Sequence, residues 1–177
     1  MNESLVAELG RLVDSLGVEA GRVKPDTLAG LAEKLAKFFG VKPDEVAILV
    51  LTRGDKFLKF LLPEELQSIG TIPMSSTSSL AVRTVKEKRA ELANNFTAVR
   101  HASVFEGVPL GRREQQPIHK IMTAPILAEN KVVGVVQISR KGRTATEAGP
   151  DFTQKDLREL VSITGVLGRF IQHCQVS

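Results

Sequence analysis

Residues 119–140, which read HKIMTAPILAENKVVGVVQISR, decide the fold. Two aliphatic runs, His119–Leu127 and Val132–Arg140, flank the short polar segment 128–131. Runs of this length around a polar turn are typical of an antiparallel β-hairpin. We therefore predict two adjacent strands here, and the other elements are placed relative to them.

Further strands and helices are predicted upstream of this hairpin. Glu45–Thr52 and Phe57–Leu62 are apolar runs around a polar turn, which indicates a second antiparallel hairpin. Apolar residues at spacings of three and four predict a helix that begins around Pro25 and ends at Gly40. The remaining elements are a hydroxyl-rich loop over 70–79, a helix over 78–89 and a short strand over 90–92.

The two ends of the chain carry apolar stripes. Both stripes alternate spacings of three and four residues, which places each one on a single helix face. The stripe residues are Leu5, Leu9, Leu12 and Leu16 at the start, and Leu157, Leu160, Leu167 and Ile171 near the end, with Thr164 at the position between Leu160 and Leu167. Thr153 with Asp156 is a candidate cap for the second helix. We predict a helical element over 1–22, which serves as a dimer contact or docks on the domain, followed by a domain over 23–177.

The order of these elements predicts the fold class. Antiparallel hairpins separated by helices are typical of an α+β domain in which one sheet is covered by helices. Residues 94–116 follow no clear period, and a stretch of that length inside a compact domain is usually functional or mobile.

Several short motifs together resemble the GAF domain family. The motifs are 120–126 (KIMTAPI) for its penultimate strand, 131–138 (KVVGVVQI) for its last strand, 152–157 (FTQKDL) for its final helix, and 78–85 with 90–92 for its middle. By their order and spacing, the stretch from Thr27 to Cys174 is identified as similar to a GAF domain.

This resemblance implies both an architecture and a class of function. It implies a central antiparallel sheet, helices packed on one face, and loops or short helices over a ligand pocket on the other. It also implies that the first and last helices often pair between two subunits, which the apolar stripes fit independently. Members of the family bind cyclic nucleotides, tetrapyrroles, haem or small metabolites, and some only dimerise.

Composition argues against several partners. The net charge is +4, but residues 100–143 alone hold eight basic and three acidic side chains. Such a surplus either attracts an anionic ligand, a phosphate backbone or an acidic partner, or belongs to a solvated loop and the ends of two strands. The chain has no Trp and no Tyr, so it lacks the stacking platforms that favour nucleic-acid binding.

Cysteine and histidine content argues against most cofactor chemistry. Cys174 is the only cysteine, so the chain can form neither an internal disulfide nor a zinc cluster held by several cysteines. The resemblance adds that covalent bilin, which needs a cysteine within the domain, is not favoured. Free methionine sulfoxide reduction is not favoured either, because a second thiol must resolve the sulfenic acid. The three histidines show no metal-ligand spacing, and haem is not favoured.

Subfamily and enzyme signatures are incomplete. The cyclic-nucleotide branch carries an Asn-Lys-Phe-Asp-Glu signature, of which residues 94–97 share only fragments. No nucleophile motif supports hydrolysis, so we expect no catalytic residue, no metal site and no enzyme.

The candidate ligand pocket combines a hydroxyl loop with polar residues of other segments. Ser75, Ser76, Thr77 and Ser78 lead into a helix whose free N–H groups favour an anionic or polar ligand, although plain helix capping is the alternative. Arg100, His101 and Arg112 are candidates for countercharge. Thr123 and Gln137 interrupt apolar strands, and either point into the cavity or lie on an exposed face.

The sequence thus predicts a sensory or regulatory module. We expect a homodimer that binds a small polar or anionic molecule, a metabolite or a nucleotide, and acts on a separate output protein. The alternative is a ligand-free dimerisation or interaction module. The first residues lack a secretory signal and the longest apolar run, Val46–Leu51, is shorter than the ~20 residues of a membrane span, so we expect a cytoplasmic location and no membrane partner.

Overall fold

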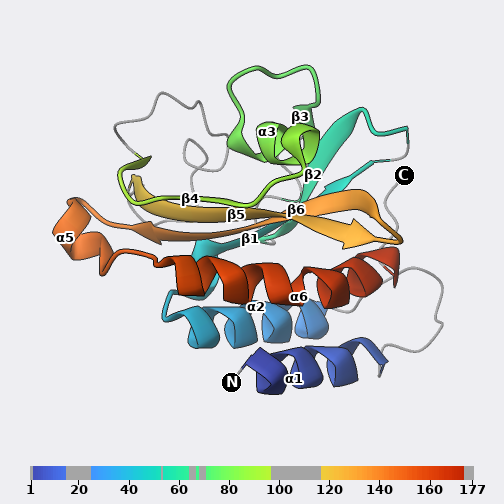
Figure 1. Ribbon diagram of the computed structural model, residues 1–177, viewed down its shortest axis with the longest axis horizontal. Coiled ribbons are helices and arrows are strands. Elements are labelled where there is room, and N and C mark those ends of the chain that lie inside the picture. Colours follow the sequence, from blue (N-terminus) through green and yellow to red (C-terminus); the bar gives the residue numbers. More distant parts are fainter. Residues whose placement is uncertain are drawn as a thin grey trace.

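The centre of the molecule is a six-stranded antiparallel sheet in the order β3-β2-β1-β6-β5-β4 (Figure 1). This is seen in a computed structural model that describes residues 2–14, 25–52, 54–63, 67, 71–96 and 117–173. The strands are β1 Val46–Leu51, β2 Phe57–Leu62, β3 Thr71–Pro73, β4 Glu91–Ala93, β5 Ile118–Ala128 and β6 Lys131–Lys141. Both predicted hairpins are confirmed, and the α+β fold class with them.

The β5–β6 hairpin is the longest pairing in the sheet, and it extends slightly beyond its predicted ends. Ala128 pairs with Lys131, so the turn holds only Glu129 and Asn130. Their φ angles are 52° and 64°, as the two central residues of a type I′ turn require. This turn type follows the right-handed twist of the strands, and the hairpin therefore anchors the middle of the sheet.

One strand was not predicted. Residues 71–73, placed in the hydroxyl-rich loop by sequence, form β3 and pair with the outer side of β2. Only Ile72 is buried, at 4 % exposure, and Pro73 is tolerated because β3 is an edge strand. Three residues with one buried side chain carry no strand period, so the pattern did not reveal this element.

Helices cover the two faces of the sheet unequally, as the predicted architecture requires (Figure 1). On one face lie α1 Asn2–Asp14, α2 Pro25–Phe39 and α6 Gln154–His173, whereas α3 Leu80–Glu87 lies on the other. The short helices η1 Pro43–Glu45 and α5 Ala145–Ala148 are connections. In the part of the chain that the structure describes, no helix has the length and apolarity needed to cross a membrane.

The apolar stripes of the terminal helices pack within the chain itself. Leu160, Leu167 and Ile171 of α6 are at most 4 % exposed, and Leu5 and Leu9 of α1 join the same core cluster. Leu157 is partly buried against that cluster. The side chain of Leu12 and the whole of Leu16 lie outside the described residues. Of the two roles considered for α1, docking on the domain is the arrangement present in this chain.

Two glycines let α6 and the central strands approach closely. A Cβ on Gly168 of α6 would lie 2.1 Å from the Leu127 carbonyl oxygen, and one on Gly134 of β6 would lie 2.3 Å from the Leu49 carbonyl oxygen. Both distances are far below van der Waals contact. The sequence pattern aliphatic-Gly-aliphatic in β6 therefore serves close packing.

The start of α6 is capped as the sequence predicts. The Asp156 N–H donates to Thr153 Oγ1 at 3.1 Å, and the Thr153 N–H donates to Asp156 Oδ2 at 2.8 Å. This reciprocal pair satisfies two N–H groups at the helix start and fixes where α6 begins.

Candidate functional site

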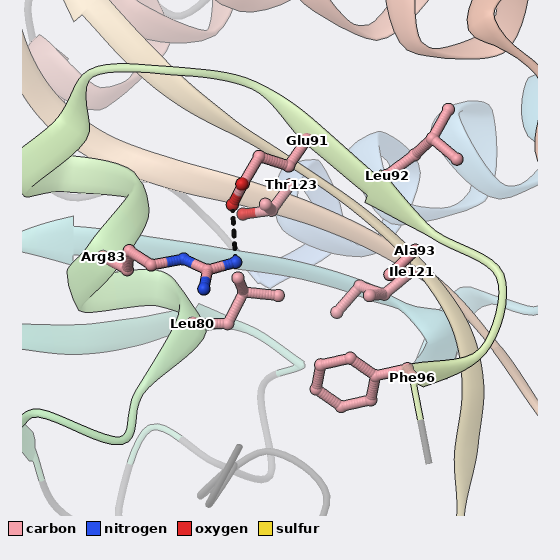
Figure 2. Close-up of a pocket in the computed structure, with 8 residues that line it drawn as sticks. All are labelled: Leu80, Arg83, Glu91, Leu92, Ala93, Phe96, Ile121 and Thr123. Atoms are coloured by element: carbon pink, nitrogen blue, oxygen red, sulfur yellow. Dashed lines mark hydrogen bonds and ion pairs between the residues drawn. The ribbon is translucent and has the colours of Figure 1, made fainter. Parts of the chain in front are cut away.

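The face opposite the helical layer holds a small cavity. Strand side chains alternate between the faces, so Ala47, Leu49, Ile121 and Val135 point towards α3. The eight residues of α3 span roughly 12 Å, which is too short to cover the whole sheet. A cavity of about 130 Å³ remains between α3, β4 and β5 (Figure 2). Its described lining consists of Leu80, Arg83, Glu91, Leu92, Ala93, Phe96, Ile121 and Thr123.

A buried polar row crosses the sheet beneath α3. Thr123 of β5 lies opposite Gln137 of β6, and its Oγ1 is 2.9 Å from Thr84 Oγ1 of α3. Gln137 Nε2 donates to Thr123 Oγ1 at 3.4 Å, and the Thr84 hydroxyl also donates to the Leu80 carbonyl at 2.9 Å. All three side chains are at most 4 % exposed. Thr123 and Gln137 thus face the protein interior, and Thr123 lines the cavity.

An ion pair forms the rim of the cavity. Arg83 Nη2 of α3 lies 2.8 Å from Glu91 Oε2 of β4, and Figure 2 shows this pair facing the apolar side chains. Arg83 and Glu91 side chains are 40 % and 24 % exposed. Arg89 continues the network, since its Nη2 lies 3.1 Å from Glu91 Oε1 and 3.2 Å from Glu87 Oε1. The buried Nε of Arg83 has no hydrogen-bond partner among the described atoms.

The hydroxyl-rich loop over 70–79 does not form part of the described cavity lining. None of Ser75, Ser76, Thr77 and Ser78 belongs to the described lining of the cavity. Ser79, one residue further on, caps α3: its Oγ accepts from the Val82 N–H at 3.3 Å. Capping, the alternative considered for this loop, is therefore the role that the structure shows for its last serine. Arg100, His101 and Arg112 lie outside the described residues, so their countercharge role stays a prediction.

Two lysines from the basic surplus hold strand ends in place. Lys120 is 7 % exposed, and its Nζ contacts the Gly149 carbonyl and lies 2.9 Å from Asp151 Oδ1. Lys141 Nζ donates to the Asp44 carbonyl at 3.2 Å. Burial lowers the pKa of Lys141 below its ordinary value of 10.5, although nearby Asp44 and Glu45 oppose that shift.

Arg140 of the same surplus ties α2 to the segment before α6. Its guanidinium donates to the carbonyls of Phe39 and Gly40, at 3.2 and 3.0 Å, which lie at the end of α2. The Arg140 Cζ also lies 4.7 Å from the centre of the Phe152 ring. Cations favour the C-terminal ends of helices. Arg140, Lys120 and Lys141 thus bind parts of the fold at strand ends, as one alternative for the basic surplus held, whereas Arg100, Arg112 and Arg113 lie outside the described residues.

A reciprocal clamp joins the cavity wall to the start of α6. Asn94, directly after β4, donates through Nδ2 to the Phe152 carbonyl at 2.9 Å. The Phe152 N–H donates back to Asn94 Oδ1 at 2.8 Å. One side chain thereby satisfies both backbone groups of Phe152, two residues before α6 begins.

Arg83 and Glu91 were not predicted as site residues. Both lie in motifs that support the family resemblance. The one sequence feature that could have indicated Arg83 is its charge between Val82 and Thr84, which are buried in α3. Their meeting depends on the chain reversal at Lys88, whose φ is 51°. A left-handed lysine is not evident from sequence, because the conformation favours glycine or asparagine.

Comparisons with known proteins agree on the fold. The family model described as "GAF domain" matches residues 25–169. The chain is similar to the GAF domain from an Acinetobacter phosphoenolpyruvate-protein phosphotransferase, with 15% identity, a TM-score of 0.68, and coverage of 98% of this chain and 94% of that one. No match is found among curated proteins.

Two further solved structures show how varied the proteins with this fold are. Residues 122 to 287 of a methyl-accepting chemotaxis protein match with 14% identity and a TM-score of 0.63, over 93% of this chain and 95% of that one. The free methionine-R-sulfoxide reductase from Neisseria meningitidis matches with 12% identity and a TM-score of 0.63, over 98% and 89%. At these identities the likeness shows the fold alone, which signalling proteins and enzymes share.

Proposed function

The chain belongs to the GAF domain family, and on that premise we propose that it is a regulatory module that binds a small polar molecule beneath α3. The observation that carries this proposal is the cavity between α3, β4 and β5, which has an apolar floor and an ion pair at its rim. A few polar groups placed around an apolar hollow are typical of small-molecule sites.

The size of the cavity favours a metabolite over a nucleotide. Its volume is about 130 Å³. Drug-sized ligands occupy pockets of about 300–1,000 Å³. An apolar cavity of about 150 Å³ accommodates benzene. The enclosed part of the ligand is therefore a group of a few non-hydrogen atoms.

The Asn94 clamp suggests how occupancy would reach the terminal helices. Glu91–Ala93 lines the cavity, Asn94 follows it directly, and Phe152 precedes α6. If a ligand binds more tightly when β4 lies in one of two positions, it shifts the population towards that position. Through the Asn94–Phe152 hydrogen bonds, the start of α6 would move with β4. The α6 helix contacts both the sheet and α1, so this shift would be passed to the surface of the molecule.

We propose that the module has no catalytic activity. A chain with the single cysteine Cys174 cannot resolve a sulfenic acid with a second thiol of its own, which is the chemistry expected of a sulfoxide reductase. We also propose that the module is cytoplasmic and acts on a separate output protein.

A homodimer is part of the proposal, although its contact differs from the predicted stripes. Because Leu160, Leu167 and Ile171 are buried in their own chain, a second copy would have to meet the outward face of α6. Val161 on that face is 46% exposed. Light scattering on the wild type and on Val161→Glu tests this, and a monomeric wild type at micromolar concentration would remove the dimer from the proposal.

The ligand site is tested by thermal shifts against a panel of small metabolites. We expect at least one compound to raise the melting temperature of the wild type and to have no effect on Ala93→Leu, which fills the cavity. Ala145→Leu, at an exposed position of α5, is the matched control and should respond like the wild type. If the panel shifts nothing, or shifts Ala93→Leu equally, the ligand-free interaction module becomes the better explanation.

A further inference from the structure

The distribution of charge in the cavity identifies the class of ligand. Resting on the proposed function, we infer that the site takes a zwitterion: a free α-amino acid with a small apolar side chain. Its carboxylate would meet Arg83, its ammonium would meet Glu91, and its side chain would enter the apolar floor.

The charges of the described rim residues balance, which does not favour a simple anion. The network joins the cations Arg83 and Arg89 to the anions Glu87 and Glu91 through contacts of 2.8–3.2 Å. Two positive and two negative charges sum to zero. A ligand that carries only a carboxylate would therefore place its charge beside the carboxylate of Glu91, and one that carries only an amine would approach Arg83. A ligand with both charges offsets both.

The spacing of the pair matches an amino acid. The two charges at the rim are adjacent, since Arg83 Nη2 and Glu91 Oε2 are 2.8 Å apart. An α-amino acid carries its ammonium and carboxylate on one carbon atom, so its charges are also adjacent. The two dipoles can therefore lie antiparallel, side by side, with each charge of the ligand next to the opposite charge of the rim.

Polarity falls from the rim to the floor. The Arg83 and Glu91 side chains are partly exposed, whereas Leu80, Phe96 and Ile121 are between 2 % and 6 % exposed. Thr123 adds a hydroxyl, but it is 2.9 Å from the Thr84 hydroxyl and so is already paired. No charged group of the described lining lies among these floor residues. The side chain that fits is therefore apolar.

The volume limits the length of that side chain. About 130 Å³ is slightly less than the cavity of about 150 Å³ that holds benzene. A branched aliphatic chain of three or four carbons is smaller than benzene and fits such a space. Glycine would leave the floor without a partner and lose the apolar contribution.

The decisive experiment compares three probes that share one carbon skeleton. Calorimetric titration of the wild type would use L-leucine, 4-methylpentanoate and 3-methylbutylamine, which present both charges, only the carboxylate and only the ammonium. We expect L-leucine to bind at least about tenfold more tightly than either analogue. Equal or tighter binding of 4-methylpentanoate would overturn the zwitterion and assign an anion site. Glycine, as a size probe, should bind more weakly than L-leucine, because it leaves the apolar floor without a partner.

Two conservative variants localise the effect. Glu91→Gln keeps the shape of the rim but removes the charge that would meet the ammonium, so the preference for L-leucine over 4-methylpentanoate should fall towards one. Glu87→Gln alters the same network outside the cavity lining and should keep the wild-type preference within about twofold. An unchanged preference in Glu91→Gln would contradict the assignment. If that variant does not fold, the three probes on the wild type still decide.

The outcomes separate this inference from the proposed function. If no amino acid binds while another compound of the panel stabilises the wild type but not Ala93→Leu, the site stands and its ligand class is wrong. If nothing binds in any assay, both fail.

Discussion

The two faces of the sheet differ in how closely their side chains are packed. The face under α1, α2 and α6 is packed so tightly that Gly168 of α6 has no room for a Cβ against the Leu127 carbonyl. In the part of the chain that the structure describes, the face under α3 is covered by one helix of eight residues, holds a cavity of about 130 Å³, and has a row of hydroxyl and amide groups across the sheet beneath that helix.

This difference separates stability from binding. Close packing over a long helix gives the helical face most of the buried apolar side chains, which drive folding. Incomplete cover on the α3 face leaves a space that a ligand can fill. Because the helical face supplies most of the packing, a ligand can bind or leave the α3 face without a large loss of stability.

The largest effect is expected from truncating one leucine on each face. Leu160→Ala should lower the free energy of unfolding by about 2–5 kcal/mol, because this fully buried side chain leaves a hole in a packed core. Leu80→Ala should cost about 2 kcal/mol or less, since Leu80 already borders empty space. Urea denaturation measures both. Equal costs would show that the α3 face is packed as firmly as the other.

A pair of glycine variants within α6 sharpens the same comparison. Gly168→Ala should destabilise the protein by about 1–3 kcal/mol because its Cβ would meet the Leu127 carbonyl. Gly165→Ala, with no heavy atom within 4 Å of its Cβ position, should gain about 0.5–1 kcal/mol from helix propensity. Denaturation midpoints read out both signs. A neutral Gly168→Ala would mean that α6 can move away from β5.

The smallest effect compares the helix caps of the two faces. Thr153→Ala removes the hydroxyl that accepts from the Asp156 N–H at 3.1 Å, half of the reciprocal cap of α6, and should cost about 1 kcal/mol. Ser79→Ala removes the longer bond of 3.3 Å at α3 and should cost about half as much. Thermal unfolding at equal protein concentration measures the difference. The reverse ranking would place more of the folding energy in α3 than the packing indicates.

Much of the scaffold was predictable because its signals are local. The β5–β6 hairpin has two aliphatic runs around a polar turn, and the start of α6 has Thr153 and Asp156 three residues apart. The edge strand β3 was missed because three residues around one buried Ile72 show no period. The buried state of Thr123 and Gln137 was left open, since a polar residue in a strand has no local sign of which face it occupies.

The family, the two hairpins and the cap of the last helix follow from local patterns, because residues that are neighbours in the chain create them. The position of the site follows from packing between distant segments. The cavity lies where α3, β4 and β5 meet, and the Arg83–Glu91 pair forms because the chain reverses at Lys88 to bring β4 beside α3. The tertiary structure also decided that the apolar stripe residues Leu5, Leu9, Leu160, Leu167 and Ile171 are buried in their own chain. A stripe of apolar residues predicts that a helix face is covered. Whether the same chain or a second copy covers it depends on the packing of the folded molecule.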